Sequence, residues 1–223
     1  MKILFVSSEC APFSKSGGLA DVAFSLPPAL QKTGDELTIV IPMYRVTQEN
    51  YGDQFSLIKT CVIHLGQRQL SCALYKGELN GVTVYAIGNE HLFHRPRLYG
   101  YGDDSLRFAF FCRAVIDLLP EFGDLPDILH CNDWETALAI LYLKNDAVLN
   151  DALSHIKTVY TIHNIAYQGQ FGRSEMETTF ALPDGWYHGG LSYEFEGRQD
   201  INLMKGAMLM ADAVTTVSPT YAR

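Results

Sequence analysis

The chain has 223 residues, enough for one large domain, and its formal net charge is −8. This acidic balance argues against a protein that binds a nucleic-acid backbone, and no apolar stretch approaches the roughly 18 residues of a membrane span. The five cysteines form no C-x-x-C pair, so we predict reduced thiols in a cytoplasmic protein rather than a disulfide framework.

The first elements predict a β-α-β unit. Residues 2–6 and 37–41 are continuous apolar runs, typical of strands buried on both faces. Between them, apolar residues recur at three- and four-residue spacing over 18–33, which predicts a helix. Pro27 and Pro28 inside this helix predict a kink or an early break. Two buried strands joined by a helix predict a parallel sheet.

The middle of the chain has a different pattern. Short strand-like segments at 55–65, 69–76 and 82–87 are separated by turn residues. They predict an antiparallel hairpin excursion beside the parallel sheet. The segment 90–104 contains Pro, Gly and aromatic residues without a period, so we expect an irregular surface loop.

Regular alternation then returns, and the predicted fold class is α/β with a Rossmann-like parallel sheet flanked by helices. The segment 166–199 is rich in Gly and aromatic residues, with short helical pieces. Ser218 and Pro219 predict the start of a helix close to Arg223, so we expect the chain to be a fragment. The predicted elements are helices at 105–119, 134–144 and 200–210, and strands at 127–131, 157–162 and 213–217.

The segment Lys15-Ser16-Gly17-Gly18-Leu19-Ala20-Asp21 is the first candidate site, because it lies between the first strand and the first helix. Gly17 and Gly18 let a ligand approach the backbone, and the N–H groups at a helix start attract anions. Lys15 adds a mobile positive charge for a diphosphate, and Asp21 can accept sugar hydroxyls or cap the helix. A structural turn with a solvated lysine remains an alternative.

Two further polar clusters follow predicted strands. Asp133 and Trp134 come after one strand, and His163 and Asn164 come after the next. A helix N-cap at Asp133, a core Trp134 and a backbone-satisfied His163 are the structural alternatives. Because the carboxyl ends of parallel strands meet at one sheet edge, we expect these clusters to converge with the glycine turn.

Other chemistries find little support in the sequence. His91 and His94 have the spacing of metal ligands, but no third ligand pattern lies near them, so no metal site and no cofactor are predicted. The G-x-S-x-G motif of serine hydrolases is absent.

Four stretches together resemble one family. They are KILFVSSECAPFSKSGGLADV (2–22), HCNDWETAL (130–138), YTIHNIAYQG (160–169) and DAVTTVSPTYA (212–222). They are similar to bacterial glycogen synthases and plant starch synthases, which are ADP-glucose-dependent glucosyltransferases of glycosyltransferase family 5. The four stretches spread over the whole chain and occur in the same order as in the family.

The resemblance implies the first half of a twin-Rossmann (GT-B) enzyme, with the active site in the cleft between two domains. Residues 1–223 would form the amino-terminal domain, and the carboxy-terminal nucleotide-binding domain would be absent from this chain. The implied reaction transfers glucose from ADP-glucose to the non-reducing end of an α-1,4-glucan, such as glycogen, starch or a maltooligosaccharide, with retention. It implies the bacterial cytoplasm, or a plastid if the source is a plant.

The family's site residues carry over onto this sequence as expectations. Those expected to take part in catalysis are Asp133 and His163. Glu135 stands where some relatives have His or Gln. The residues expected to bind substrate are Lys15, Gly17, Gly18, Asp21, Tyr99, Asn164 and Gln168.

Two rival functions remain. The first is a non-catalytic glucan-binding module, which would bind glucan but not the sugar nucleotide. The second is a Rossmann dehydrogenase, which is disfavoured because the chain lacks G-x-G-x-x-G and has Pro42 where the ribose-binding acid is expected.

Overall fold

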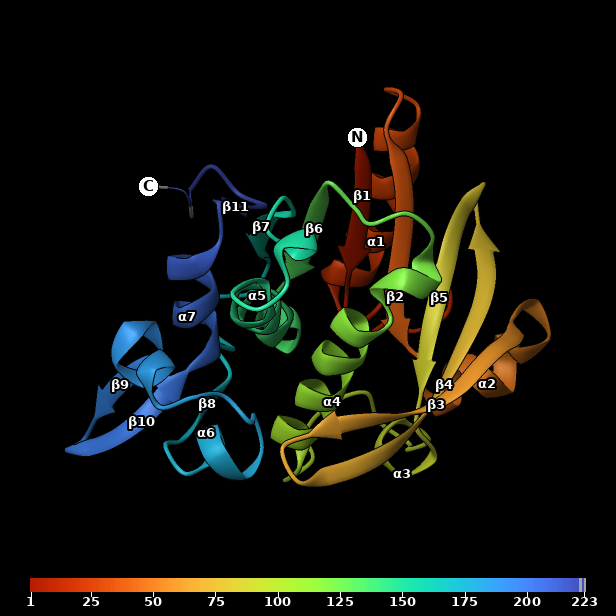
Figure 1. Ribbon diagram of the computed structural model, residues 1–223. Coiled ribbons are helices and arrows are strands. Elements are labelled where there is room, and N and C mark those ends of the chain that lie inside the picture. Colours follow the sequence, from red (N-terminus) through yellow and green to blue (C-terminus); the bar gives the residue numbers. More distant parts are fainter. Residues whose placement is uncertain (221, 223) are drawn as a thin grey trace.

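The computed structural model describes residues 1–220 and 222, which fold around an eight-stranded sheet of order β11-β7-β6-β1-β2-β5-β4-β3 (Figure 1). Strands β11, β7, β6, β1, β2 and β5 run parallel, while β4 is antiparallel to β5 and β3 to β4. The predicted parallel sheet with an antiparallel excursion is confirmed. Its strands are β1 (Lys2–Val6), β2 (Glu36–Pro42), β3 (Ser56–Leu65), β4 (Arg68–Leu79), β5 (Val82–Gly88), β6 (Ile128–Asn132), β7 (Lys157–Ile162) and β11 (Ala213–Thr216).

Helices cover both faces of the sheet because its central strands are apolar on both sides. Along β1, Ile3 and Phe5 join the cluster that contains Ala23 of α1, whereas Leu4 and Val6 join the cluster formed with α4 and α5. The α-helices are α1 (Gly18–Gln31), α2 (Arg45–Tyr51), α3 (Glu90–Phe93), α4 (Asp104–Asp117), α5 (Trp134–Ala147), α6 (Glu175–Thr178) and α7 (Leu203–Met210). Short helical turns lie at Gly52–Gln54, Leu119–Phe122, Asp151–Leu153 and Tyr187–Leu191.

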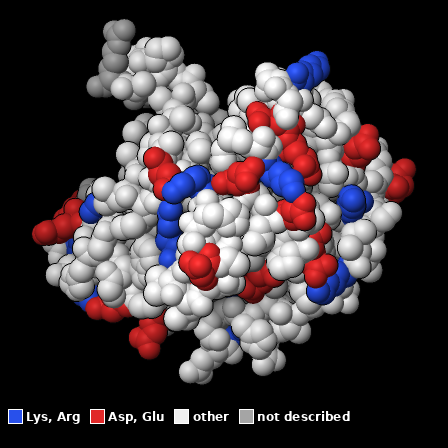
Figure 2. Space-filling view, turned by 45° about the horizontal axis from the view of Figure 1, so that its top comes forward, with Lys and Arg blue, Asp and Glu red and all other residues white. Residues whose placement is uncertain are grey.

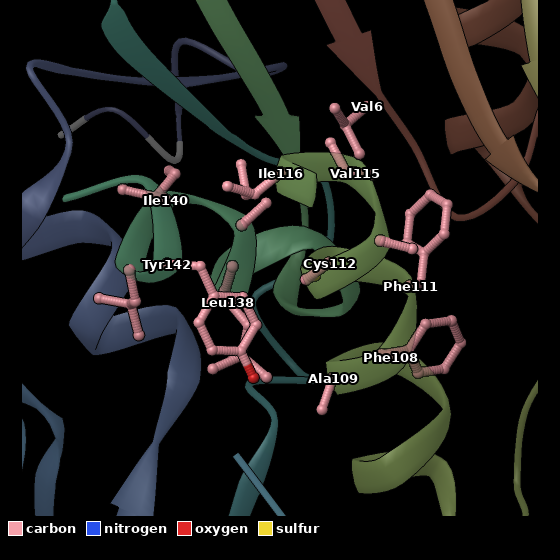
Figure 3. Packing of buried hydrophobic residues seen from close by; sticks show 14 of the residues in the cluster. Val6, Phe108, Ala109, Phe111, Cys112, Val115, Ile116, Leu138, Ile140 and Tyr142 are labelled. Atoms are coloured by element: carbon pink, nitrogen blue, oxygen red, sulfur yellow. The ribbon is translucent and has the colours of Figure 1, made fainter. Parts of the chain in front are cut away.

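The larger core lies where α4 and α5 pack together. Figure 3 shows Phe111 and Val115 of α4 in one buried cluster with Leu138 of α5 and Val6 of β1. Burying each such side chain contributes about 1.5–3 kcal/mol relative to leaving it exposed. This core therefore holds the start of α5, and with it the end of β6, against the centre of the sheet.

Helix α1 continues through Pro27 and Pro28, so the predicted early break is wrong. Each proline removes a backbone N–H donor. Leu19, Ala23 and Pro27 are nevertheless buried, and this packing against the sheet stabilises the helix across the prolines.

A second departure precedes α7. Strand β10 (Arg198–Asn202) occupies the start of the predicted helix 200–210, and pairs with β8 (Gln170–Gly172) and β9 (Ser192–Phe195) in a small antiparallel sheet that was not predicted. The Asn202 side chain accepts a hydrogen bond from the Lys205 N–H (2.9 Å), which caps α7 and sets its boundary.

Two other segments also differ from expectation. The predicted loop 90–104 begins with α3, whose Leu92 and Phe93 are buried, before it becomes irregular. At the predicted helix after Ser218, the described residues form a turn with a bond from the Ala222 N–H to the Ser218 carbonyl (3.2 Å). Tyr221 and Arg223, which fall in that predicted helix, lie outside the described residues.

On the face shown in Figure 2, basic and acidic side chains are interspersed, without a broad basic area. In the described part of the chain, no helix combines the length and apolar character needed to cross a bilayer.

Replacing Phe111 with Ala tests the importance of the α4–α5 core. Phe111 is fully buried, so we expect the substitution to lower the free energy of unfolding by roughly 3–5 kcal/mol. Urea denaturation measures this loss. The matched control is Phe24→Ala, at a side chain that is 39% exposed, which we expect to cost about 1 kcal/mol or less. Equal losses in the two variants would contradict the assignment.

Candidate active site

The candidate site lies where the chain order of the parallel strands reverses. Strand β1 pairs with β2 on one side and with β6 on the other, and ligands of open α/β sheets bind at the carboxyl ends of strands at such a point. A cavity of about 830 Å³ opens there. The residues predicted from the sequence that line it are Gly17, Gly18, Tyr99, Asp133, His163 and Asn164.

The glycine turn forms one wall of the cavity. Gly17 is the N-cap of α1 and has an extended backbone, so its φ does not require glycine. A Cβ at Gly18 would meet no atom within 4 Å and would project into open space. The absence of a side chain thus leaves the N-terminus of this 14-residue helix accessible to a ligand.

Lys15 and Asp21 are paired with each other at the surface. The Lys15 Nζ lies 2.6 and 2.8 Å from the two Asp21 carboxylate oxygens, and both side chains are more than half exposed. Neither residue lines the cavity, although the neighbouring Ser16 does. An exposed pair of this kind contributes little to stability, so Lys15 can exchange Asp21 for another anion.

Asp133 joins the ends of β6 and β7. Its Oδ1 accepts hydrogen bonds from the backbone N–H groups of His163 (2.7 Å) and Asn164 (3.2 Å). Asp133 is the N-cap residue of α5, as the structural alternative proposed, but its side chain makes no capping bond to the helix. Burial raises the pKa of Asp133 to about 6, against the effect of these two bonds and with a smaller contribution from Glu9.

His163 is oriented by Asn132, which the sequence analysis did not select. The Asn132 Nδ2 donates to the Val6 carbonyl (3.0 Å), so its Oδ1 faces the His163 Nε2 at 2.9 Å. This network assigns the ring proton to Nε2 and leaves Nδ1 as an acceptor. Burial lowers the pKa of His163 to about 4, so the imidazole is neutral at physiological pH.

The remaining predicted residues have different surroundings. The Tyr99 hydroxyl is 2.9 Å from the Ser8 Oγ, which places the phenol at the end of β1. The Asn164 Oδ1 accepts from the Ala166 N–H (3.0 Å) in a local turn. Gln168 lies outside the cavity lining, and its Oε1 accepts from the Asn202 Nδ2 at 2.6 Å.

Trp134 packs in the core, as the structural alternative proposed, and it also lines the cavity. Its ring meets Phe108 and Phe171 at centroid distances of 5.2 and 5.6 Å. Gly169 has a φ of +63°, and a Cβ there would lie 2.7 Å from the Trp134 Cε3. The loop after β7 can therefore pack on Trp134 only because residue 169 is glycine.

Three acidic residues that were not predicted as site residues also line the cavity: Glu9, Asp104 and Glu135. Glu9 follows β1 and accepts a hydrogen bond from the Ser16 N–H. Asp104 pairs with Arg107 (2.5 Å) and accepts from the Gly100 N–H (2.7 Å). The position of Glu9 just beyond a buried strand was the signal available in the sequence.

No group of three or more His, Cys, Asp and Glu side chains within residues 1–220 and 222 is arranged to hold a metal ion. The His94 Nδ1 is instead 3.2 Å from the Gln48 Oε1.

Comparison with known proteins points to one family. The profile of the starch synthase catalytic domain matches residues 2–223. The chain is 43% identical to the glycogen synthase of Bacillus cereus over 221 residues, and 40% identical to that of Clostridium novyi over 223 residues. These alignments cover 99% and 100% of the chain but 46% of each relative, so the chain spans about half of their length.

A solved structure agrees with these sequence relatives. The chain is similar to the catalytic domain of starch synthase IV from Arabidopsis thaliana bound to ADP and acarbose, with a TM-score of 0.86 and 31% identity. The match covers 99% of this chain and 45% of that one.

Burial reverses the usual order of the pKa values of Asp133 and His163, and NMR can test this. We expect the Asp133 carboxyl carbon to titrate near pH 6 and the His163 ring near pH 4. At pH 5 the carboxyl is then mostly protonated while the imidazole is mostly neutral. Asp133→Asn should remove the upper transition, which identifies it. A His163 ring that gains its proton at a higher pH than Asp133 would contradict the geometry.

Proposed function

Because the chain belongs to the starch synthase catalytic domain family, we propose that it is the amino-terminal domain of a two-domain glucosyltransferase. The whole protein transfers glucose from ADP-glucose to the non-reducing end of an α-1,4-glucan, with retention at the anomeric carbon. The observation that carries this proposal is the convergence of Gly17–Gly18, Asp133 and His163 on one cavity at the switch point of the sheet. The relative solved with ADP and acarbose supports a site for a nucleotide and a sugar there.

The donor diphosphate binds at the glycine turn. Gly17 and Gly18, at the start of α1, line the cavity, and the positive end of the helix dipole favours an anion there. Lys15 exchanges its bond with Asp21 for one with the diphosphate. Asp21 is then free to accept hydroxyl groups from the sugar.

The glucose occupies the side of the cavity formed by β6 and β7. The neutral His163 accepts a hydrogen bond from a sugar hydroxyl at Nδ1, because Asn132 holds its Nε2–H. Asn164 binds a second hydroxyl, and Tyr99 closes the wall behind the sugar. Asp133 positions His163 and carries negative charge above its pKa of about 6, close to the anomeric carbon where positive charge develops. Gln168 lies outside the cavity and holds the loop after β7 in place through its hydrogen bond from Asn202.

The second domain completes the site. The departing diphosphate needs more positive charge than Lys15 supplies, and closure of the two domains excludes the water that would hydrolyse the donor. We place the reaction in the bacterial cytoplasm, or in a plastid if the source is a plant, because all five cysteines are free.

Replacing Lys15 with Gln in the full-length protein tests the donor site. We expect kcat/KM for ADP-glucose to fall roughly 100-fold, because the substitution removes a charge that stabilises the leaving group. The control is Lys59→Gln, which removes a surface lysine paired with Glu121 (2.6 Å) and should change little.

The outcomes of this experiment separate the proposals. If the full-length protein is active and Lys15→Gln leaves kcat/KM unchanged, the proposed glucosyltransferase activity stands but the proposed role of Lys15 is wrong. A parent that transfers glucose from neither ADP-glucose nor UDP-glucose, yet binds glucan, leaves a glucan-binding module.

Residues 1–223 expressed alone should fold and show negligible transfer, because the leaving-group charges lie in the second domain. Circular dichroism and an assay with labelled ADP-glucose measure the two properties. Glucose transfer at a rate comparable to that of the full-length protein would refute the proposal that the reaction needs the second domain.

A further inference from the structure

Two of the five free cysteines lie opposite each other in the hairpin of β3 and β4. In this antiparallel pair of strands, Cys61 of β3 is the direct partner of Cys72 of β4. Residues opposite each other in such a pair have Cα atoms about 4.5–5.5 Å apart, and their side chains share one face of the sheet. Disulfides bridge Cα separations of about 4.4–6.8 Å. The register therefore places the two cysteines at a separation that a disulfide can span.

The packing of the two side chains agrees with this register. Cys72 is buried in the larger core cluster, and Cys61 packs against the same cluster. The two thiols are also joined by a hydrogen bond. Burial raises the pKa of Cys72 well above its ordinary range, and the neighbouring Cys61 raises it further. The two sulfur atoms are thus already adjacent in the reduced protein.

Exposure distinguishes Cys61 from the other thiols. Cys61 is half-buried, whereas the other four cysteines are buried: Cys10, Cys72, Cys112 and Cys131. The charge of Cys112 also acts on Cys131, but both of these residues are fully buried. A small oxidant in the solvent therefore reaches Cys61 before the other cysteines, and the thiol that stands beside Cys61 is that of Cys72.

The hairpin lies at the edge of the sheet. Strand β3 is the last strand of the order, at the opposite end from β11 (Figure 1). It pairs with β4 on one side, so no strand on its other side resists the small adjustment that closure of an S–S bond requires. Strand β4 is in turn paired with β5. Neither cysteine lines the cavity at the end of β1, so this pair is separate from the proposed active site.

We propose that Cys61 and Cys72 form a site of reversible oxidation, at which hydrogen peroxide converts the two thiols into a disulfide that ties β3 to β4. The Cys61 thiolate attacks one peroxide oxygen and the O–O bond breaks, which gives a sulfenic acid on Cys61 and, with the thiol proton, one water. The Cys72 sulfur then attacks the Cys61 sulfur, and the hydroxyl group leaves with the Cys72 proton as a second water. Two thiols and one peroxide thus become one disulfide and two waters, and a dithiol reductant restores the thiols.

Peptide mapping of the full-length protein tests the site directly. Trypsin cleaves after Lys59, Arg68 and Lys76, which places the two cysteines in separate peptides, 60–68 and 69–76. After treatment with peroxide and alkylation of the remaining thiols, we expect these peptides to be recovered joined. The mass of the product should be about 2 Da below the sum of the two peptides, because each sulfur loses one hydrogen. Dithiothreitol should separate them again.

Two substitutions separate the roles of the two thiols. In Cys72→Ser, the sulfenic acid on Cys61 has no partner, so we expect dimedone to label Cys61. In Cys61→Ser, we expect Cys72 to stay reduced, because burial shields it from the solvent. The matched control within the wild type is the pair Cys112 and Cys131, which should be recovered reduced because both are fully buried. Circular dichroism confirms that each variant is folded.

The melting temperature tests whether the disulfide stabilises the edge of the sheet. We expect oxidation to raise the melting temperature of the wild type by roughly 5 °C, because the bond restricts the unfolded chain. Dithiothreitol should reverse this rise, and peroxide-treated Cys61→Ser should lack it. A melting temperature that is unchanged or lower in the oxidised wild type would reject the proposed tie between β3 and β4.

The mapping has outcomes that would overturn the whole inference. Recovery of peptides 60–68 and 69–76 apart, each alkylated on its cysteine after peroxide treatment, would show that no disulfide forms. Joining of either peptide mainly to a different cysteine, or to a second molecule, would also reject the pair. None of these measurements uses glucose transfer, so they decide the inference whether or not the proposed function stands.

Discussion

The hydrogen bonds from the backbone of His163 and Asn164 to the Asp133 carboxyl hold the ends of β6 and β7 together. Asp133 reaches this position with a φ of +58°, a conformation that costs a non-glycine residue of order 1–3 kcal/mol. The core between α4 and α5 offsets that strain, because it anchors the helix that begins directly after Asp133. Distortion of this junction would alter the orientation of His163 and the shape of the cavity.

The cavity separates two kinds of recognition. Its entrance at Gly17 and Gly18 presents a helix N-terminus, which suits an anion. Its inner wall presents a neutral imidazole at His163 and a carboxylate at Asp133, which suit hydroxyl groups. Burial contributes to this division, since it lowers the pKa of His163 and keeps the imidazole neutral.

The parallel sheet could be predicted because its strands are apolar on both faces. The predicted bounds of β1 and β7 agree with the structure, and β2 differs by one residue at each end. Prediction failed where packing outweighs local preference: α1 continues through Pro27 and Pro28 because its buried face packs against the sheet. The small sheet β8-β10-β9 was missed because its short strands carry no regular alternation of polar and apolar residues.

The amino-acid sequence alone indicated the family, through the four stretches that resemble it. It also predicted the α/β class and the strand ends that carry Asp133, His163 and the glycine turn, because buried strands followed by polar clusters are local patterns. Only the tertiary structure decided which side chains share the cavity. It places Glu9, Asp104 and Glu135 in the lining, leaves Gln168 outside, and pairs Lys15 with Asp21 at the surface. These outcomes depend on burial and on neighbours distant in the sequence, such as Asn132 beside Val6, which spacing along the chain does not encode.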